Sequence, residues 1–111
     1  MPRTVRTIPV EDYVLDVFED YVLDVLMRDL VGHDKHPAAF IVYLHIYGLA
    51  ARRHWSPVAG SLRHIAEATG LSKSAVQTAL HVLRRRELVT TRKTSRTATP
   101  THRVLRHWAT R

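Results

Sequence analysis

SLRHIAEATGLSKSAVQTALHVLRRREL, residues 61–88, is the stretch of sequence that decides the fold of this chain. Ser61 is a favourable N-cap, and the apolar residues after it recur at the spacing of one helix face. Gly70 stands where a helix can end in the left-handed conformation that glycine adopts most easily. Ser72 is a second N-cap, worth about 1 kcal/mol, for a helix that we expect to run through Arg86. The stretch therefore predicts two short helices joined by a tight turn.

The second predicted helix has one apolar and one polar face. Apolar residues from Val76 to Leu83 fall on one side of a 3.6-residue helix, and short polar and basic side chains fall on the other. A capped helix with such a polar face has the chemistry needed to read base edges in a DNA major groove. The residues expected to contact bases are Lys73, Ser74, Gln77, Thr78 and His81.

After this helix the sequence predicts a β-hairpin. Residues 88–92 are rich in β-branched side chains, residues 94–100 form a polar turn, and residues 102–107 return as a second strand. The tip carries cations without acidic neighbours, which suits contact with phosphates or a narrow minor groove; the alternative is a hairpin that only aids solubility. The residues expected to hold the DNA backbone are Arg63, Ser72, Arg84, Arg85, Arg92, Lys93, Thr94, Ser95 and Arg96.

These features carry a resemblance to a known family. The spacing of Ala66, Gly70 and Val76 is similar to the helix-turn-helix pattern, and the hairpin that follows looks like a wing. Residues 37–108 resemble the winged helix-turn-helix domain of MarR- or GntR-like bacterial transcription regulators. The resemblance implies a mainly α fold with a small β-hairpin wing and an extra N-terminal helix. Glu87 departs from the pattern, because these families often place glycine there.

Charge divides the chain into two parts. Residues 1–36 hold four Arg or Lys and eight Asp or Glu, whereas residues 37–111 hold thirteen and two. We therefore expect an N-terminal arm with an acidic helix over residues 1–36 and a DNA-binding domain over residues 37–111.

The chain of 111 residues contains no cysteine, which excludes disulfides and thiolate metal sites. No membrane span or signal peptide is expected, and a cytoplasmic, nucleoid-associated protein of a prokaryote fits these features.

The acidic N-terminal part contains a tandem repeat. EDYVLDVF at residues 11–18 returns as EDYVLDVL at residues 19–26, in a helix predicted to run from Pro9 to Gly32. Its apolar stripe favours a dimer contact; the alternative is that it only covers its own domain. The basic arm at residues 2–8 either enters a DNA groove or frays. The residues expected at a dimer interface are Tyr13, Val14, Val17, Phe18, Tyr21, Val25, Tyr43 and Tyr47.

Pro37 opens a helix that we expect to reach about His54. Apolar side chains surround its axis almost completely, so it must be buried on several sides, by the N-terminal helix or by a second subunit. Gly48 inside this helix predicts the close approach of another helix. Tyr43 and Tyr47 either pack in the core or an interface, or line an effector pocket like that of some MarR-like proteins.

The sequence therefore predicts a homodimeric DNA-binding protein with two recognition helices about 34 Å apart on a near-palindromic site. A transcription regulator is the first expectation. A plasmid or phage protein acting at an origin or centromere array is an alternative, and an adaptor that has lost DNA binding is another. An enzyme is not expected, because no nucleophilic cysteine, phosphate-binding glycine loop or paired carboxylates occur. No cofactor or metal is expected, and His33 and His36 near Asp34 are more typical of an exposed or capping loop than of a metal site.

Overall fold

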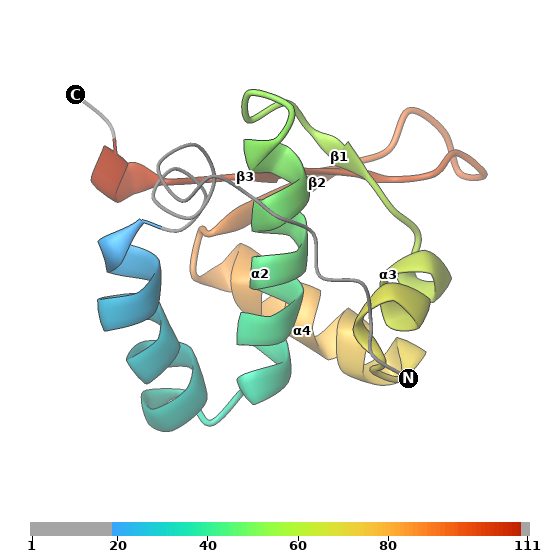
Figure 1. Cartoon of the computed structure of the whole chain (residues 1–111). Helices are drawn as coiled ribbons and strands as arrows, with labels where there is room; N and C mark the ends of the chain where they lie inside the picture. Colours follow the sequence, from blue (N-terminus) through green and yellow to red (C-terminus); the bar gives the residue numbers. More distant parts are fainter. Residues whose placement is uncertain (1–18, 110–111) are drawn as a thin grey trace, which may run out of the picture.

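The computed structural model describes residues 19–109 and confirms a mainly helical fold with a small antiparallel sheet and an extra N-terminal helix (Figure 1). This is the architecture of a winged helix-turn-helix. Its helices are η2 (Val22–Leu26), η3 (Arg28–His33), α2 (Pro37–Ala51), α3 (Leu62–Thr69), α4 (Lys73–Arg85) and the short 3₁₀ helix η4 (His107–Ala109). Its strands are β1 (Val58–Ala59), β2 (Val89–Arg92) and β3 (Thr101–Val104).

The N-terminal helix consists of η2 and η3, which follow each other through the helical residue Met27. Both are π-helical, with wider turns than an α-helix, so that residues four apart stay close to one face. Val22, Leu26 and Leu30 form such a row and are buried against the rest of the chain. The helix therefore covers its own domain, which is one of the two roles expected from its sequence.

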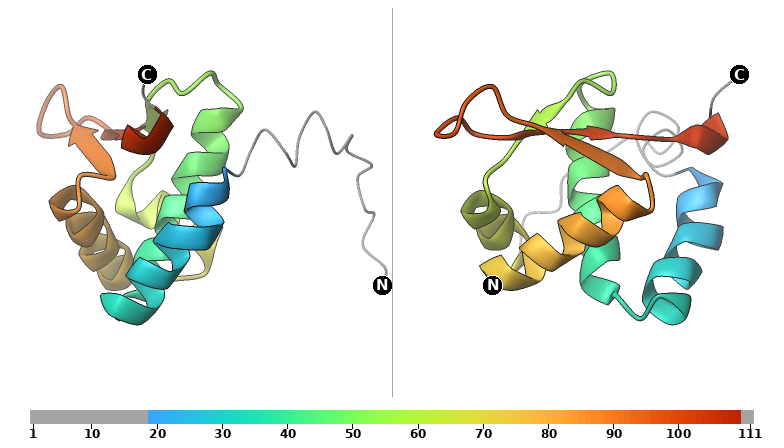
Figure 2. Two further views of the ribbon diagram at one scale, coloured as in Figure 1. Left: turned by 90° about the vertical axis from the view of Figure 1, so that its left-hand side faces the viewer. Right: turned by 180° about the vertical axis from the view of Figure 1, so that it is seen from behind.

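Helix α2 lies at the centre of the molecule, with the N-terminal helix beside it and α4 crossing behind it (Figures 1 and 2). Burial on several sides was expected from its composition and is confirmed by seven buried residues along its length. One side stays open, however, since Ile41 is 41% exposed. The close helix approach expected at Gly48 is wrong, because a Cβ built there meets no atom within 4 Å.

Helix α2 ends at Ala51, earlier than the predicted His54, because the chain turns sharply after it. His54 and Trp55 have positive φ angles of 55° and 66°, and the amide of Trp55 donates a 2.7 Å hydrogen bond back to the carbonyl of Ala50. This turn directs the chain into β1, which the sequence did not predict. β1 pairs antiparallel with β3, with Val58 opposite His102, and completes a sheet of order β1-β3-β2.

The helix-turn-helix caps are those that the sequence predicts. The hydroxyl of Ser61 accepts a 3.1 Å hydrogen bond from the amide of His64, and Ser72 accepts one of the same length from Ala75. Gly70 adopts the left-handed conformation with φ of 83°. The tight turn between α3 and α4 is thus fixed by local chemistry.

The end of α4 shows how this chain accommodates Glu87. Glu87 has φ of 58°, the left-handed conformation in which glycine is favoured. The amide of Glu87 donates to the carbonyl of Arg84 at 3.0 Å, and the amide of Leu88 donates to that of Leu83 at 2.9 Å. These two bonds form a Schellman motif, and the buried Leu83 and Leu88 supply its apolar contact. The backbone therefore turns into the wing as it would with glycine, at the cost of a strained glutamate.

Candidate nucleic-acid interface

Helix α4 exposes the polar face that the sequence predicts. Its opposite face is buried in the core through Val76, Ala79, Leu80, Val82 and Leu83. The side chains that remain exposed include all five expected base-contacting residues and both arginines of the last turn: Lys73, Ser74, Gln77, Thr78, His81, Arg84 and Arg85. We call this set the α4 face.

The N-terminal end of the α4 face is arranged by its cap. The hydroxyl of Ser72 accepts from the amide of Ala75 and lies 3.3 Å from the hydroxyl of Ser74. Ser72 therefore serves the helix, and Ser74 stands beside it on the exposed side. A capped helix end with hydroxyl groups in its first turn has donors suited to a phosphate or a base edge.

A series of hydrogen bonds runs from the exposed α4 face through the wing into the core. Arg84 Nη1 donates to Thr91 Oγ1 at 3.3 Å, and this hydroxyl lies 3.0 Å from Nδ1 of His102. His102 Nε2 lies 2.8 Å from the carbonyl oxygen of Gly60. Since a carbonyl only accepts, Nε2 carries the proton and Nδ1 accepts from Thr91. Arg84 is thus a link between helix and wing as well as an exposed cation.

His102 is 1% exposed and is the one buried polar residue of the described core. Burial lowers its pKa from the ordinary value, more than the hydrogen bond to Gly60 raises it, and the charge of Arg84 lowers it further. The imidazole is therefore neutral near pH 7. The sequence reasoning missed this residue, although strand alternation with the exposed Arg103 placed it on the inner face.

The wing tip is exposed and carries three cations and two hydroxyl side chains. Its five predicted residues, Arg92, Lys93, Thr94, Ser95 and Arg96, all lie on the surface. Lys93 Nζ donates to the carbonyl oxygen of Arg96 at 3.0 Å, so one lysine closes the turn. The tip projects at the same end of the molecule as α3, with the N-terminal helix at the other end (Figures 1 and 2).

The outer surface of the wing carries one further cation that the sequence analysis did not single out. Arg103 is exposed on β3, directly opposite Thr90 on β2. Arg92 lies on the same surface, and Arg103 and Arg92 line a small depression there. The positive charge of the wing therefore continues from the tip along the outer face of its strands.

Arg63, expected to hold the DNA backbone, lies on the exposed side of α3. Its Nε lies 3.3 Å from Oε2 of Glu67, one helical turn later, and both side chains are largely exposed. Such a surface pair is weak. Arg63 can exchange this partner for a phosphate, but its charge is partly neutralised in the free protein.

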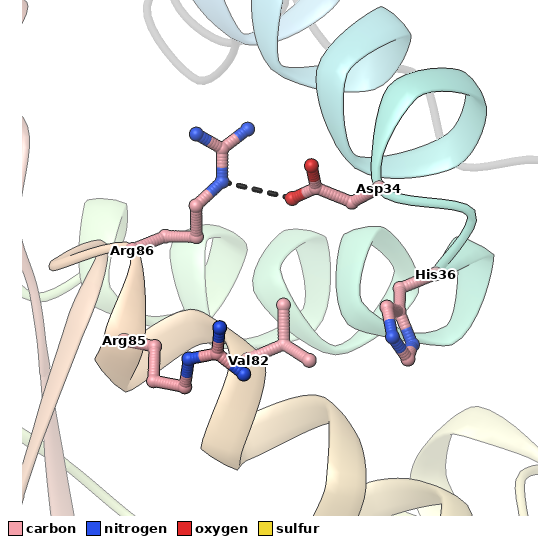
Figure 3. A pocket seen from close by; sticks show the side chains of 5 residues that line it. All are labelled: Asp34, His36, Val82, Arg85 and Arg86. Atoms are coloured by element: carbon pink, nitrogen blue, oxygen red, sulfur yellow. Dashed lines mark ion pairs between the residues drawn. The ribbon is translucent and has the colours of Figure 1, made fainter.

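A polar pocket of about 330 Å³ lies where the linker before α2 meets the end of α4 (Figure 3). Asp34 and Arg86 face each other in it, with 2.9 Å between Oδ2 and Nε, and Arg86 Nη2 also lies 3.8 Å from Asp29 Oδ2. Arg86 thus fastens the N-terminal helix to α4, and the exposed Arg85 lines the same pocket at the edge of the α4 face. Within residues 19–109 no group of three or more metal-ligating side chains occurs.

Of the eight residues expected at a dimer interface, four lie within residues 19–109, and these four do not share one exposed surface. Tyr43 and Tyr47 have no exposed area and belong to the core of the subunit, because their rings reach inward from α2. Tyr21 stacks on Trp108 with 4.4 Å between ring centroids, and Val25 is half-buried. The remaining four, Tyr13, Val14, Val17 and Phe18, lie outside the described residues.

None of the helices in residues 19–109 combines the length and apolar character that crossing a membrane requires. Comparison with known proteins gives no significant match to a protein-family model, a curated protein or a solved structure.

Proposed function

We propose that this chain binds double-stranded DNA in a sequence-specific manner, with the α4 face in the major groove and the wing on the flanking backbone. The observation that carries the proposal is the composition of the α4 face, which combines hydroxyl, amide, imidazole and cationic side chains on a capped, exposed helix. The wing tip adds cations at the same end as α3, and residues 37–111 hold thirteen basic against two acidic residues. Charge and motif therefore point to the same partner.

The residues of the α4 face divide by chemistry. Gln77 suits the two hydrogen-bonding groups of adenine, and Ser74 and Thr78 can each donate or accept at a base edge. Lys73 suits guanine or a phosphate, and His81 completes the central part of the face. The backbone is held by Arg63, Ser72, Arg84, Arg85, Arg92, Lys93, Thr94, Ser95 and Arg96, and we add Arg103 on the outer face of the wing.

The biological role that fits this chemistry best is transcription regulation in a prokaryote, by a homodimer resembling MarR- or GntR-like regulators. A homodimer has two α4 faces, and each reads one half-site. The arrangement of the two half-sites depends on the surface through which the subunits pair.

Selection of bound duplexes from a random pool tests the proposal. Wild-type protein should enrich a defined half-site, and Gln77→Ala should relax the preference at one or two base pairs of it. Arg96→Ala should weaken binding to all sequences alike, whereas the matched control Arg53→Ala, on the loop after α2, should do neither. The proposal fails if the wild type enriches no sequence and retains no duplex at low salt. The base-reading role of α4 fails if Gln77→Ala leaves the preference intact.

A further inference from the structure

The described residues expose four large apolar side chains, and all four come from the N-terminal helix and its neighbour α2. Leu23, Met27 and Val31 are 46%, 44% and 38% exposed, and Ile41 is 41% exposed. Single exposed apolar residues are ordinary, but Leu23, Met27 and Val31 line one open groove, and contiguous exposed apolar side chains are typical of a binding surface. We call this group the apolar stripe.

The position of the stripe follows from the contacts on either side of it. Asp29 precedes the buried Leu30 and reaches Arg86 at the end of α4, whereas Val31 follows Leu30 on the other side of the same helix. The stripe therefore lies on the side away from α4. The side chain of Ile41 projects from the uncovered side of α2. Gly48 lies two helical turns later, and a Cβ built there also meets no atom within 4 Å. Figure 1 views the molecule from this side, with α4 behind α2.

The charges beside the stripe are self-complementary. Leu23, Met27 and Val31 line an open groove of about 410 Å³ together with Asp24, Arg28 and Gly32. Asp24 and Arg28 are four residues apart on one flank, so two such helices packed antiparallel would place Asp24 of each opposite Arg28 of the other. Within residues 19–109, no ion pair occupies either charge. Gly32 at the end of the same flank allows close approach of a helix.

We propose that a second copy of this chain docks on the apolar stripe, through antiparallel pairing of the two N-terminal helices with reciprocal Asp24–Arg28 ion pairs. Dimerisation through the stripe does not depend on the proposed DNA binding; only its consequence for how the dimer engages duplexes rests on that proposal. Because α4 and the stripe lie on opposite sides of α2, the pair would present its two α4 faces outward. Such a dimer joins two duplexes, or two distant sites on one duplex, instead of filling successive major grooves of one short site.

The first test is the mass of the full chain in solution, measured by sedimentation over a range of concentrations. Wild type should be a dimer, and Met27→Glu should be a monomer with an unchanged circular dichroism spectrum. Ala68→Glu, which places the same charge on the exposed side of α3, should remain a dimer. A monomeric wild type, or a Met27→Glu dimer as stable as wild type, overturns the inference.

Charge exchange tests the antiparallel pairing itself. Asp24→Arg places two like charges opposite each other and should weaken dimerisation by about tenfold or more. The double variant Asp24→Arg/Arg28→Asp restores opposite charges and should recover wild-type dimerisation. Loss without recovery in the double variant overturns the antiparallel register.

A bridging assay tests the outward arrangement. Wild type should retain a labelled duplex on beads that carry a second, unlabelled duplex, and monomeric Met27→Glu should not. Met27→Glu should still bind a single half-site duplex, which keeps this result separate from failure of DNA binding itself. A wild-type dimer that fills one short palindrome and bridges nothing contradicts the outward arrangement.

Discussion

The hydroxyl of Tyr47 donates a 2.8 Å hydrogen bond to Oε1 of Glu19, a residue 28 positions earlier in the chain. The same carboxylate accepts hydrogen bonds of 3.1 Å from Arg106 Nη1 and from Trp108 Nε1. Burial alone would raise the pKa of Glu19, but the three donors and the charge of Arg106 together lower it below its ordinary value. One ionised carboxylate therefore joins the N-terminal helix, α2 and the end of the chain.

Tyr43 and Tyr47 form a matched pair for testing this junction. Tyr47→Phe removes a donor to a half-buried carboxylate and should lower the free energy of unfolding by about 1.5–3 kcal/mol. The hydroxyl of Tyr43 is buried without a hydrogen-bond partner among the described residues, so Tyr43→Phe should be neutral or stabilising. Urea unfolding of the two variants measures the difference. Equal losses would show that the hydroxyl of Tyr47 contributes no more than that of Tyr43.

The left-handed Glu87 predicts a stabilising substitution. Glu87→Gly should raise the free energy of unfolding by about 1 kcal/mol, because it removes the Cβ from a conformation that disfavours it. Glu87→Ala makes the same change in charge but keeps the Cβ, and should not stabilise. If thermal unfolding gives both variants the same midpoint, strain at residue 87 is not the cause.

Two glycines should respond to alanine in opposite directions. Gly48 lies inside α2 with open space around its Cα, so Gly48→Ala should stabilise by about 0.5–1 kcal/mol. Gly70 has φ of 83°, so Gly70→Ala should destabilise by about 1 kcal/mol although nothing obstructs the methyl group. Denaturant unfolding at a protein concentration that keeps the oligomeric state constant measures both effects. A stabilising Gly70→Ala would contradict the left-handed turn.

The buried His102 predicts that stability depends on pH. Its pKa in the folded chain lies below the ordinary value of 6.5, so the unfolded chain binds a proton first as the pH falls. The free energy of unfolding should therefore be flat above about pH 7 and decline from pH 6.5 toward pH 5. The pKa of His45 is lowered by burial and then by His64, and it contributes with the same sign. The lowered pKa of Glu19 contributes stability that is fully present above its ordinary value of 4.5 and is lost only as the pH falls below that value.

The variant His102→Gln separates the contribution of His102 from that of His45. It should be less stable than wild type at pH 7.5, because the series of hydrogen bonds from Arg84 through Thr91 and His102 to Gly60 is broken. It should nevertheless lose less stability than wild type between pH 7 and pH 5. Chemical unfolding at several pH values gives both quantities. An unchanged slope would show that His102 is not the group that titrates.

Features set by local chemistry were predictable from the sequence, and features set by distant contacts were not. Ser61, Gly70 and Ser72 determine their own turns, so the caps of α3 and α4 were predicted correctly. The two-residue β1 carries no periodic signal of its own and exists because β3 pairs with it. The sequence identified Glu87 as a departure but could not show that it keeps the left-handed conformation.

In the candidate site, too, features set by local sequence were predictable and features set by distant contacts were not. The alternation of apolar and polar residues on α4 predicted which side chains are exposed, because one face of a helix is buried as a unit. The sequence of α2 is apolar all round and did not show which way its tyrosines point, so core and interface both stayed open for Tyr43 and Tyr47; both are buried within the subunit. The exposed Leu23, Met27 and Val31 were missed, because the predicted stripe followed Tyr21 and Val25, which are half-buried on another side of the same helix.

The salt dependence of duplex binding tests most directly whether the α4 face and the wing form a DNA-binding surface. Fluorescence anisotropy with a labelled duplex should show affinity falling by about 10³ between 50 and 200 mM salt, as six or more phosphate contacts require. The double variant Arg92→Ala/Arg96→Ala should reduce the slope of log affinity against log salt by about 2, and Arg53→Ala should leave it unchanged. Absence of binding at 50 mM salt, or a wild-type slope in the double variant, would contradict the account.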